Sequence, residues 1–266
     1  MLLAIDLGNT NLTLGLFSEG ELLHTFRIES RRERTADEYA IALAQMLELR
    51  RVSSSEVTAA IIASVVPTLT RVLLDAVRLA FHLEALVVGP GTDVGLTLRV
   101  DRPEEVGADR IVNVAAARAR ALIDAGTSDP NALLDRGAIV IDLGTATTFD
   151  CLSPRGEFVG GVIVPGVRTS LDALIARAAK LPTVELIAPQ AVLGKNTVQC
   201  LQSGMVYGYA SLVDGLVSKL KAELTFDCEV IATGGLAASL EKHTQSIERV
   251  DPNLTLWGLL AIYRRN

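Results

Sequence analysis

Cysteine and histidine are scarce in this chain of 266 residues. The three cysteines, Cys151, Cys200 and Cys228, are odd in number and widely spaced, and they form no C-x-x-C motif. The three histidines are scattered along the chain. Because zinc sites need closely spaced ligands, we expect no zinc site, and we interpret the cysteines as reduced thiols of a cytoplasmic protein.

An excess of positive charge is also missing. The formal net charge is -6 and the isoelectric point lies near 5.2. Affinity for a nucleic-acid backbone comes mainly from clustered Lys and Arg, so this composition argues against nucleic acid as a partner. An anionic substrate would have to be bound by local hydrogen-bond donors and metal ions.

The chain lacks long apolar segments as well. Its apolar start is interrupted at Asp6 and carries no basic leader, so we predict neither a signal peptide nor a membrane span. With 49% hydrophobic residues, a chain of 266 residues can still fill the cores of two modest domains that share a cleft.

An internal repeat is the main feature that the sequence does contain. The segment Asp6-Leu7-Gly8-Asn9-Thr10 returns, 136 residues later, as Asp142-Leu143-Gly144-Thr145. The surroundings match at the same offset, with Ile5, Gly20 and Glu21 corresponding to Ile141, Gly156 and Glu157. The repeat predicts two copies of one unit led by a β-hairpin, each with an aspartate and a glycine at its first turn.

Two such turns are suited to binding phosphate. A turn that lacks a Cβ at Gly8 or Gly144 lets backbone N–H groups approach an anion, and aspartates such as Asp6 and Asp142 can hold the cations that screen it. Asn9, Thr10, Thr145, Thr147 and Thr148 would add donors. The alternative is that Asp-Leu-Gly only marks hairpin turns. It would be preferred for a single copy, whereas two copies in matching contexts favour phosphate binding.

Hydrophobic periodicity and turn residues predict the same order of strands and helices in both halves. A capping box at Thr35 and Glu38 begins the first helix, and the turn-rich stretch 126–137 separates an N-terminal domain, 1–125, from a C-terminal domain, 126–266. Strands are expected at 2–5, 12–17, 21–28, 59–66, 85–88, 139–142, 147–152, 157–164 and 230–232, and further helices after Pro67 and at 109–125, from about 170, at 198–224 and at 254–264. This pattern predicts an α/β fold with mixed sheets.

The segment Gly107-Ala108-Asp109-Arg110 stands directly before a predicted helix. In the simpler interpretation, Asp109 caps the helix by accepting a backbone N–H. In the functional interpretation, the same helix start offers free N–H groups and a positive dipole end to an anion. The residues of this segment alone favour the simpler interpretation.

The motifs taken together resemble type III pantothenate kinase. The resemblance spans residues 6 to 235, and the Asp-x-Gly turns alone would indicate only the wider actin, hexokinase and acetate-kinase-like superfamily. One departure is Cys200, where the family is expected to have serine. The motifs that carry the resemblance are the two Asp-Leu-Gly turns, Gly107 to Arg110, Gly160-Gly161 with Pro165-Gly166, Gly194-Lys195-Asn196-Thr197-Val198-Gln199, Gln202-Ser203-Gly204 and Thr233-Gly234-Gly235.

The resemblance implies a duplicated RNase-H-like fold of the actin-like ATPase type, with an interdomain nucleotide cleft. It implies an enzyme, a phosphotransferase that moves the ATP γ-phosphate to the primary hydroxyl of pantothenate. The product is 4'-phosphopantothenate, and the reaction is the first step of coenzyme A biosynthesis. The implied cofactors are ATP, Mg²⁺ and a monovalent cation, K⁺ or NH₄⁺. A homodimer with the substrate site near its interface is also implied.

The resemblance further implies roles for particular residues. Asp109 would accept the hydroxyl proton, Asp142 would bind the monovalent cation, and Asp6 is a second expected metal ligand. Arg110 would pair with the pantothenate carboxylate or steady the transferring phosphoryl group, and its position does not decide which. The expected ATP contacts are Asp6, Leu7, Gly8, Asn9, Thr10, Asn11, Leu12, Thr13 and Thr145, and the expected pantothenate contacts are Gly107, Ala108, Asp109, Arg110 and Thr197.

Two other functions compete with this one. The first is a kinase of the same superfamily that acts on another small hydroxyl substrate, and the pairing of Gly107 to Arg110 with Gly194 to Thr197 argues against it. The second is a regulatory nucleotide-binding homologue without turnover. The presence of Asp6, Asp109, Asp142 and Thr197 argues against it.

Overall fold

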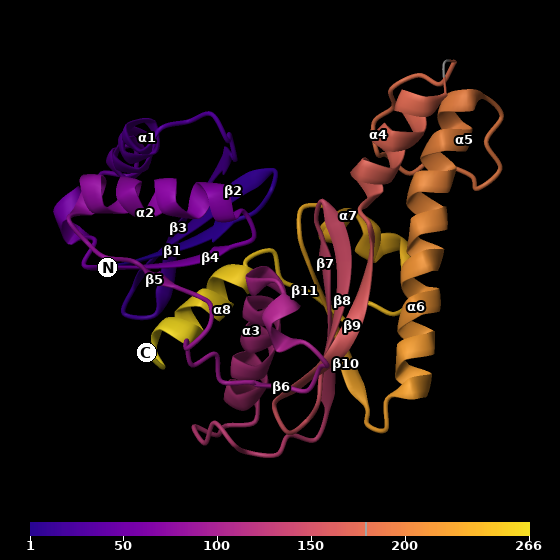
Figure 1. The fold of residues 1–266 in the computed structure, drawn as a ribbon. Coiled ribbons are helices and arrows are strands. Elements are labelled where there is room, and N and C mark those ends of the chain that lie inside the picture. The colour runs from indigo at the N-terminus through magenta and orange to yellow at the C-terminus, as the bar shows by residue number, and fades with distance from the viewer. Residues whose placement is uncertain (179) are drawn as a thin grey trace. The chain divides into compact units, whose positions relative to one another are not determined.

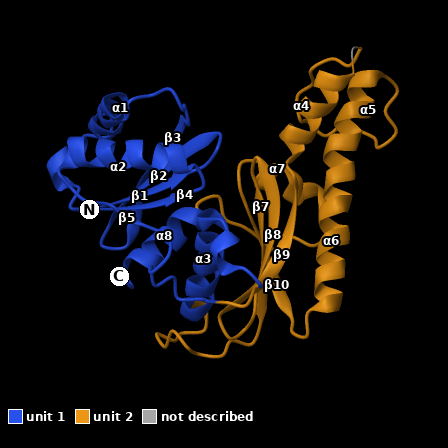
Figure 2. Ribbon diagram, in the orientation of Figure 1, with its two compact units in different colours: residues 1–97, 101–123, 254–266 blue, residues 98–100, 124–253 orange. Residues whose placement is uncertain are grey.

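The computed structural model describes residues 1–178 and 180–266, which form two compact units (Figure 2). Unit 1 comprises Met1–Thr97, Asp101–Ile123 and Leu254–Asn266, and unit 2 comprises Leu98–Val100 and Asp124–Asn253. The passage from one unit to the other at 123–124 lies close to the predicted boundary after 125. The C-terminal segment differs from the predicted division, because residues 254–266 pack with unit 1.

Unit 1 is a five-stranded mixed sheet with helices on both faces (Figure 1). The strand order is β3-β2-β1-β4-β5, in which β1 pairs antiparallel with β2 and parallel with β4. The strands are β1 (Leu2–Leu7), β2 (Asn11–Ser18), β3 (Glu21–Glu29), β4 (Ala59–Ser64) and β5 (Leu86–Val87), and the helices are α1 (Ala36–Glu48), α2 (Pro67–Phe81), α3 (Ala108–Asp124) and α8 (Leu254–Tyr263), with short 3-10 turns at Ser54–Glu56 and Pro103–Glu105.

The alternation of side-chain direction along β1 explains why the sheet carries helices on both faces. Leu3, Ile5 and Leu7 belong to the core under α1 and α2, whereas Leu2 and Ala4 belong to the core with α3 and α8. Since successive side chains of a strand point to opposite faces, an apolar strand can fill both layers at once. The predicted capping box is confirmed: the Glu38 N–H lies 3.3 Å from Thr35 Oγ1, and the Thr35 N–H donates to Glu38 Oε2 at 2.7 Å.

Unit 2 repeats the strand order of unit 1. Its sheet runs β11-β10-β7-β8-β9-β6, so β9-β8-β7-β10-β11 corresponds to β3-β2-β1-β4-β5. The predicted α/β fold with two mixed sheets and a duplicated plan is therefore confirmed. The strands are β6 (Thr97–Leu98), β7 (Gly137–Leu143), β8 (Ala146–Leu152), β9 (Glu157–Pro165), β10 (Cys228–Thr233) and β11 (Arg249–Val250), and the helices are α4 (Val167–Arg177), α5 (Thr197–Ser203), α6 (Tyr209–Glu223) and α7 (Ala237–Leu240), with a 3-10 turn at Glu241–His243.

The helix predicted at 198–224 is present, but one turn of it is not α-helical. Gly204–Gly208 forms a π-helical turn between α5 and α6. A π turn needs wider backbone spacing, and glycine at both of its ends has little intrinsic preference for an α-helix. The turn places two tyrosines on different partners, because Tyr207 Oη donates to the Pro189 carbonyl oxygen at 2.6 Å while Tyr209 Oη lies 2.7 Å from Thr147 Oγ1.

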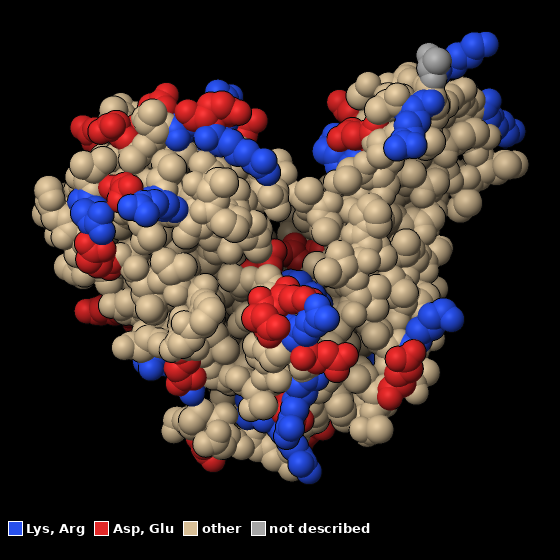
Figure 3. All heavy atoms as spheres, viewed as in Figure 1, with Lys and Arg blue, Asp and Glu red and all other residues tan. Residues whose placement is uncertain are grey.

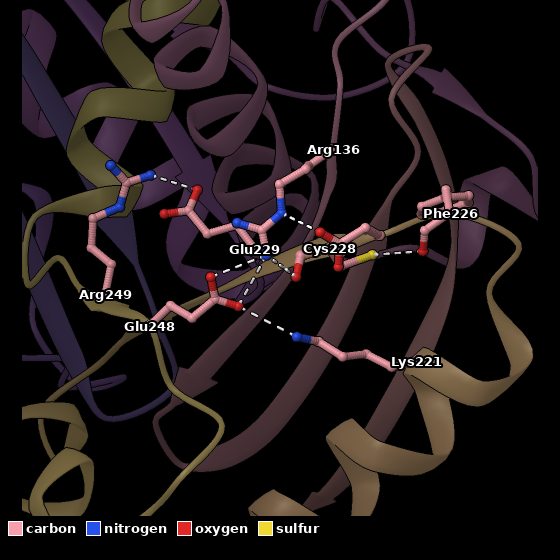
Figure 4. A network of polar contacts seen from close by, with 8 residues as sticks. Arg136, Lys221, Phe226, Cys228, Glu229, Glu248 and Arg249 are labelled. Carbon is pink, nitrogen blue, oxygen red and sulfur yellow. Dashed lines mark hydrogen bonds and ion pairs between the residues drawn. The ribbon is translucent and has the colours of Figure 1, made fainter.

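An ion-pair network ties the sheet of unit 2 together at the start of β7 (Figure 4). Arg136 pairs with Asp227 at 2.6 Å and Glu248 at 3.1 Å, and it donates to the Cys228 carbonyl oxygen at 2.9 Å. Lys221 at the end of α6 adds a contact of 3.3 Å with Glu248. These contacts connect the start of β7 with the start of β10, the approach to β11 and helix α6.

The surface carries charges of both signs. On the face shown in Figure 3, basic and acidic side chains lie together in small mixed clusters separated by uncharged surface. Cys151, Cys200 and Cys228 are free thiols, of which only Cys200 is exposed. Burial, followed by the nearby Asp227 carboxylate, raises the pKa of the Cys228 thiol to about 11.

Among the helices of residues 1–178 and 180–266, none is long and apolar enough to cross a membrane.

Candidate active site

The first predicted phosphate turn, residues 8–11, joins β1 to β2. It is closed by the Gly8 N–H, which donates to the Asn11 carbonyl oxygen at 3.0 Å. Asp6 lies one residue before the end of β1, opposite Thr13 on β2 and beside Ala63 on the parallel strand β4. Asp6 therefore stands near the carboxyl end of a parallel strand pair, where α/β proteins usually bind ligands.

The residues of this turn that are predicted to contact ATP differ in their exposure to solvent. Asn9 and Thr10 are exposed, and Asp6, Gly8, Asn11 and Thr13 are half-buried. Leu7 and Leu12 are buried in the core under α1 and α2. Because their side chains pack in that core, only their main-chain groups are available to a ligand.

The second phosphate turn joins β7 to β8 and is one residue shorter. The Gly144 N–H donates to the Ala146 carbonyl oxygen at 3.1 Å, and Thr145 is exposed. Asp142 lies opposite Thr148 on β8 and beside Thr233 on β10. The aspartates of the two units thus occupy equivalent places in equivalent sheets.

Thr147 and Thr148 were predicted to add hydrogen-bond donors at the second turn, but the structure does not place them there. Both are buried, and the Thr148 hydroxyl donates to Asp150 Oδ2 at 2.9 Å. The Tyr209 hydroxyl contacts both Thr147 Oγ1 at 2.7 Å and the Pro165 carbonyl oxygen at 2.8 Å. The Thr147 hydroxyl is therefore occupied inside the protein by Tyr209. Thr145 is left as the exposed hydroxyl of this turn.

Gly234 explains the Thr-Gly-Gly motif that follows β10. Its φ of +92° suits glycine, and a Cβ on it would lie 2.6 Å from Asp142 Oδ1 and 2.7 Å from the Leu143 backbone. Any larger residue would displace the Asp142 carboxylate. The motif therefore makes room for the aspartate of the second turn.

Asp109 lies in the first turn of α3. The helix begins at Ala108, so Asp109 lies two residues beyond the N-cap position, and the capping interpretation is wrong in that detail. Its Oδ1 accepts the Arg110 N–H at 2.8 Å. Burial raises the pKa of the Asp109 carboxyl, while the Arg110 N–H and the Arg110 charge oppose that rise. The carboxylate is therefore a stronger base than an exposed aspartate.

Gly107 positions the Asp109 carboxylate within unit 1. A Cβ on Gly107 would lie 2.6 Å from Asp109 Oδ1 and 3.5 Å from Val65 Cγ1. Val65 follows β4, and its N–H donates to the Leu7 carbonyl oxygen at 3.2 Å. The structure thus brings the start of α3 and the end of β1 to the same loop. Ala108 packs against the core beside α8, and Arg110 is half-buried.

Thr197 is the exposed first residue of α5 in unit 2. Asn196 caps this helix, because its Oδ1 accepts the Gln199 N–H at 2.9 Å, and Gln199 Oε1 accepts the Lys195 N–H at 3.0 Å. A Cβ on Gly194 would lie 2.5 Å from the Cys200 nitrogen. The motif from Gly194 to Gln199 is thus a tightly capped helix start that presents Thr197.

Sequence reasoning missed two residues that contact the phosphate turns. Ser30 binds the first turn and Thr169 binds the second, each through its hydroxyl. Ser30 and Gly166 are separated by the offset of the repeat, so the repeat relates these two positions but does not indicate the hydroxyl contact of Ser30. Thr169 has no counterpart in the repeat that would have indicated it.

Comparison with known proteins identifies the family. The sequence model described as type III pantothenate kinase matches residues 2–219. A type III pantothenate kinase of Moorella thermoacetica is 46% identical over 266 residues, which are all of both chains. The chain belongs to the type III pantothenate kinase family. A family member from Myxococcus xanthus is 44% identical over the whole of this chain and 99% of its own. The resemblance inferred from the motifs is therefore confirmed.

Solved structures place this pantothenate kinase family member in the expected fold. A Baf family transcriptional activator from Campylobacter jejuni gives a TM-score of 0.60 at 18% identity, covering 99% of this chain and 98% of its own. A polyphosphate/ATP-glucomannokinase from Arthrobacter sp. gives 0.50 at 15% identity, covering 99% and 97%. At such identities the likeness shows the fold alone, which is that of actin-like ATPases and sugar kinases.

Proposed function

We propose that this protein phosphorylates pantothenate with ATP to give 4'-phosphopantothenate, the first step towards coenzyme A. Its similarity to type III pantothenate kinases along the entire chain, at 46% identity, carries the proposal. The equivalent aspartates of the two turns and the basic Asp109 supply the chemistry that such a transfer requires.

The two turns are proposed to bind the ATP phosphates. Phosphoryl transfer needs positioning and charge neutralisation more than covalent help from the protein, so backbone N–H groups and short polar side chains suffice. Asn9, Thr10 and Thr145 expose such groups. The residues from Asp6 to Thr13 are proposed to line the phosphates, with Leu7 and Leu12 contributing only main-chain atoms.

The cations are proposed to bind at Asp6 and Asp142. No group of three His, Cys, Asp or Glu side chains suited to a metal occurs among the described residues, which does not fit a metal caged by protein ligands. Mg²⁺ bound to nucleotide normally takes one or two carboxylates together with phosphates and waters, and the separate aspartates fit that pattern. Asp142 is proposed to hold the monovalent cation, K⁺ or NH₄⁺. Bound cations would neutralise charge on the phosphates during transfer.

The start of α3 is proposed to bind pantothenate, through Gly107, Ala108 and Arg110. Asp109 is proposed to accept the proton of the attacking hydroxyl, for which its raised pKa suits it better than an ordinary carboxylate. Arg110 is proposed to serve an anionic group, the pantothenate carboxylate or the transferring phosphoryl group.

A homodimer is proposed to form through the region of α4 and α5, with Thr197 contacting pantothenate near the interface. The core between these helices is small, with Leu171, Val184 and Leu201 buried. In the segment between these helices, the apolar side chains of Ile187, Val192 and Leu193 are exposed by 57%, 68% and 79%. Adjacent exposed apolar side chains of this kind usually mark a protein interface, and a second copy of the chain is the proposed partner.

One coupled assay tests the proposed reaction. Purified protein is supplied with ATP, Mg²⁺ and K⁺, and ADP formation is compared with pantothenate, with sugars and with small carboxylates as acceptors. We expect turnover with pantothenate alone. Turnover only with another acceptor would establish a different kinase, and ATP binding without turnover on any acceptor would establish a regulatory homologue.

A further inference from the structure

Ser30, the residue that follows β3, donates two hydrogen bonds to backbone carbonyl groups of the first phosphate turn. Ser30 donates its N–H to the Thr10 carbonyl oxygen at 3.0 Å. Its hydroxyl donates to the Gly8 carbonyl oxygen at 2.8 Å. One half-buried serine therefore fixes the direction of two carbonyl groups in a turn of four residues.

The residue that follows β9 makes the corresponding contact in unit 2. The Gly166 N–H donates to the Thr145 carbonyl oxygen at 3.0 Å. Ser30 and Gly166 are 136 residues apart, which is the offset of the repeat. The hydroxyl of Thr169, in the first turn of α4, donates to the same Thr145 oxygen at 2.7 Å. Each turn is thus held by one N–H and one hydroxyl.

Packing explains why the two hydroxyls come from different positions. A Cβ on Gly166 would overlap the carbonyl oxygens of Gly144 and Thr145. A serine equivalent to Ser30 therefore has no room at residue 166. Thr169, one helical turn further along the chain, supplies the hydroxyl instead, so the same contact is built in two ways.

These contacts orient the N–H groups of the turns. In a planar trans peptide the C=O and the following N–H point in opposite directions. With the Gly8 carbonyl turned to Ser30, the Asn9 N–H points the other way, and the same holds for the Ala146 N–H when Thr145 is held by Thr169. Asn9 and Ala146 are exposed residues. Donors fixed before the ligand arrives lose less entropy on binding.

We propose that Ser30 and Thr169 are positioning residues that hold the two phosphate turns in the conformation that receives ATP. Neither residue touches the reacting atoms in this assignment. The identity of the ligand as ATP rests on the proposed function, whereas the two hydroxyl contacts do not.

The test compares variants that lose the hydroxyl with variants that keep it. Ser30→Ala and Thr169→Val remove the donor, and Ser30→Thr and Thr169→Ser restore it. Thr92→Val and Thr244→Val are matched controls, because these threonines also donate to main-chain carbonyls, of Val87 at 3.1 Å and Glu241 at 3.2 Å. The measurements are KM for each substrate, kcat, the melting temperature and the affinity for a non-hydrolysable ATP analogue.

We expect Ser30→Ala and Thr169→Val each to weaken analogue affinity and raise the KM for ATP about two- to tenfold, the range of one net hydrogen bond. The KM for pantothenate should change less than twofold, and the hydroxyl-retaining variants should recover most of the loss. Unchanged analogue affinity would overturn the proposal, as would a loss that the controls share. The ATP analogue binds without a phosphoryl-acceptor substrate, so the affinity measurement is valid even if pantothenate proves not to be the substrate.

Discussion

Asp109 shows how a single side chain acquires its chemistry from its surroundings. Gly107 leaves space for the carboxylate, and the Arg110 N–H holds Oδ1 at 2.8 Å. Burial nevertheless prevails and raises the pKa of the Asp109 carboxyl. A raised pKa makes the carboxylate better at taking a proton, but it also means that ionised Asp109 disfavours the folded state at neutral pH.

Asp109→Asn is expected to lower kcat by about 10² to 10⁴ while ATP affinity is kept, since the amide preserves shape and removes the proton acceptor. The melting temperature at neutral pH should be equal or higher, because a carboxyl with a raised pKa stabilises the fold only when protonated. Steady-state kinetics and calorimetry check both, with exposed Asp101→Asn as the control. If the variant keeps more than about a tenth of the rate, Asp109 is not the base.

The pH profile of the wild-type enzyme gives a second measurement at Asp109. The base acts when ionised, so kcat/KM should rise with pH through the Asp109 pKa. Because burial raises this pKa above the ordinary aspartate value of 3.8, the acidic limb should lie at higher pH than for an exposed aspartate. An acidic limb at or below that ordinary value would contradict the assignment.

Asp142 is expected to make activity depend on the monovalent cation. An aspartate next to a phosphate is tolerated when a cation lies between the two anions, so Asp142→Ala should remove most of the rate and the preference for K⁺ over Na⁺. Initial rates in matched K⁺ and Na⁺ buffers measure this, with exposed Asp135→Ala as the control. Equal wild-type rates in the two salts would refute the site.

At the scale of elements, the sequence was informative wherever a local pattern determines structure. The Thr35 and Glu38 pair predicted the start of α1, and the Asp-Leu-Gly repeat predicted a turn after β1 and after β7, because capping and turn formation involve residues close in sequence. β6 (Thr97–Leu98) was not predicted, since a strand of two residues exists only through its pairing in the sheet of unit 2.

The side-chain contacts of the turns lay outside such patterns. Ser30 and Thr169 bind carbonyls that lie 22 and 24 residues away in sequence, so their role appears only when the strands are assembled. Thr147 was misjudged for the same reason. Its place in a polar run suggested a hydroxyl that donates a hydrogen bond to phosphate, whereas tertiary packing buries Thr147 against Tyr209.

The ion-pair network at β7 and β10 should contribute to the stability of unit 2 mainly at low salt. Arg136 has a side chain that is 42% exposed, so screening reduces its pairs with Asp227 and Glu248, and we expect Arg136→Ala to cost about 1 kcal/mol. Hydrogen exchange of the β10 and β11 amides checks this at low and high salt. Arg99→Ala, which loses one more exposed pair, is the control. A loss independent of salt would assign the effect to the Cys228 hydrogen bond.

At the scale of the whole molecule, the proposed dimer makes a prediction about mixtures. Thr197→Val should raise the KM for pantothenate more than the KM for ATP, because it deletes one substrate hydrogen bond of about 0.5 to 1.5 kcal/mol. If Thr197 acts across the interface, mixing this variant with inactive Asp109→Asn protein should restore some intact sites once subunits exchange. The assay compares the activity of the mixture with the summed activities of the two variants measured separately.

Subunit exchange is followed separately with differently tagged chains. Leu193→Asp, placed in the exposed apolar surface near α5, should shift the protein towards monomer in sedimentation. Exchange without recovered activity would show that each chain builds its own pantothenate pocket.

The path of the chain through its two units affects how the protein is made. Leu256, Leu259 and Ile262 of α8 pack with Leu2 and Ala4 of β1 in one core, although more than 250 residues separate them. On the ribosome, β1 emerges before unit 2, and α8 emerges after it. One face of the sheet of unit 1 must therefore remain without α8 while unit 2 is translated, and unit 1 is completed after unit 2. Nascent chains should accordingly expose this face to chaperones until residues 254–266 leave the exit tunnel.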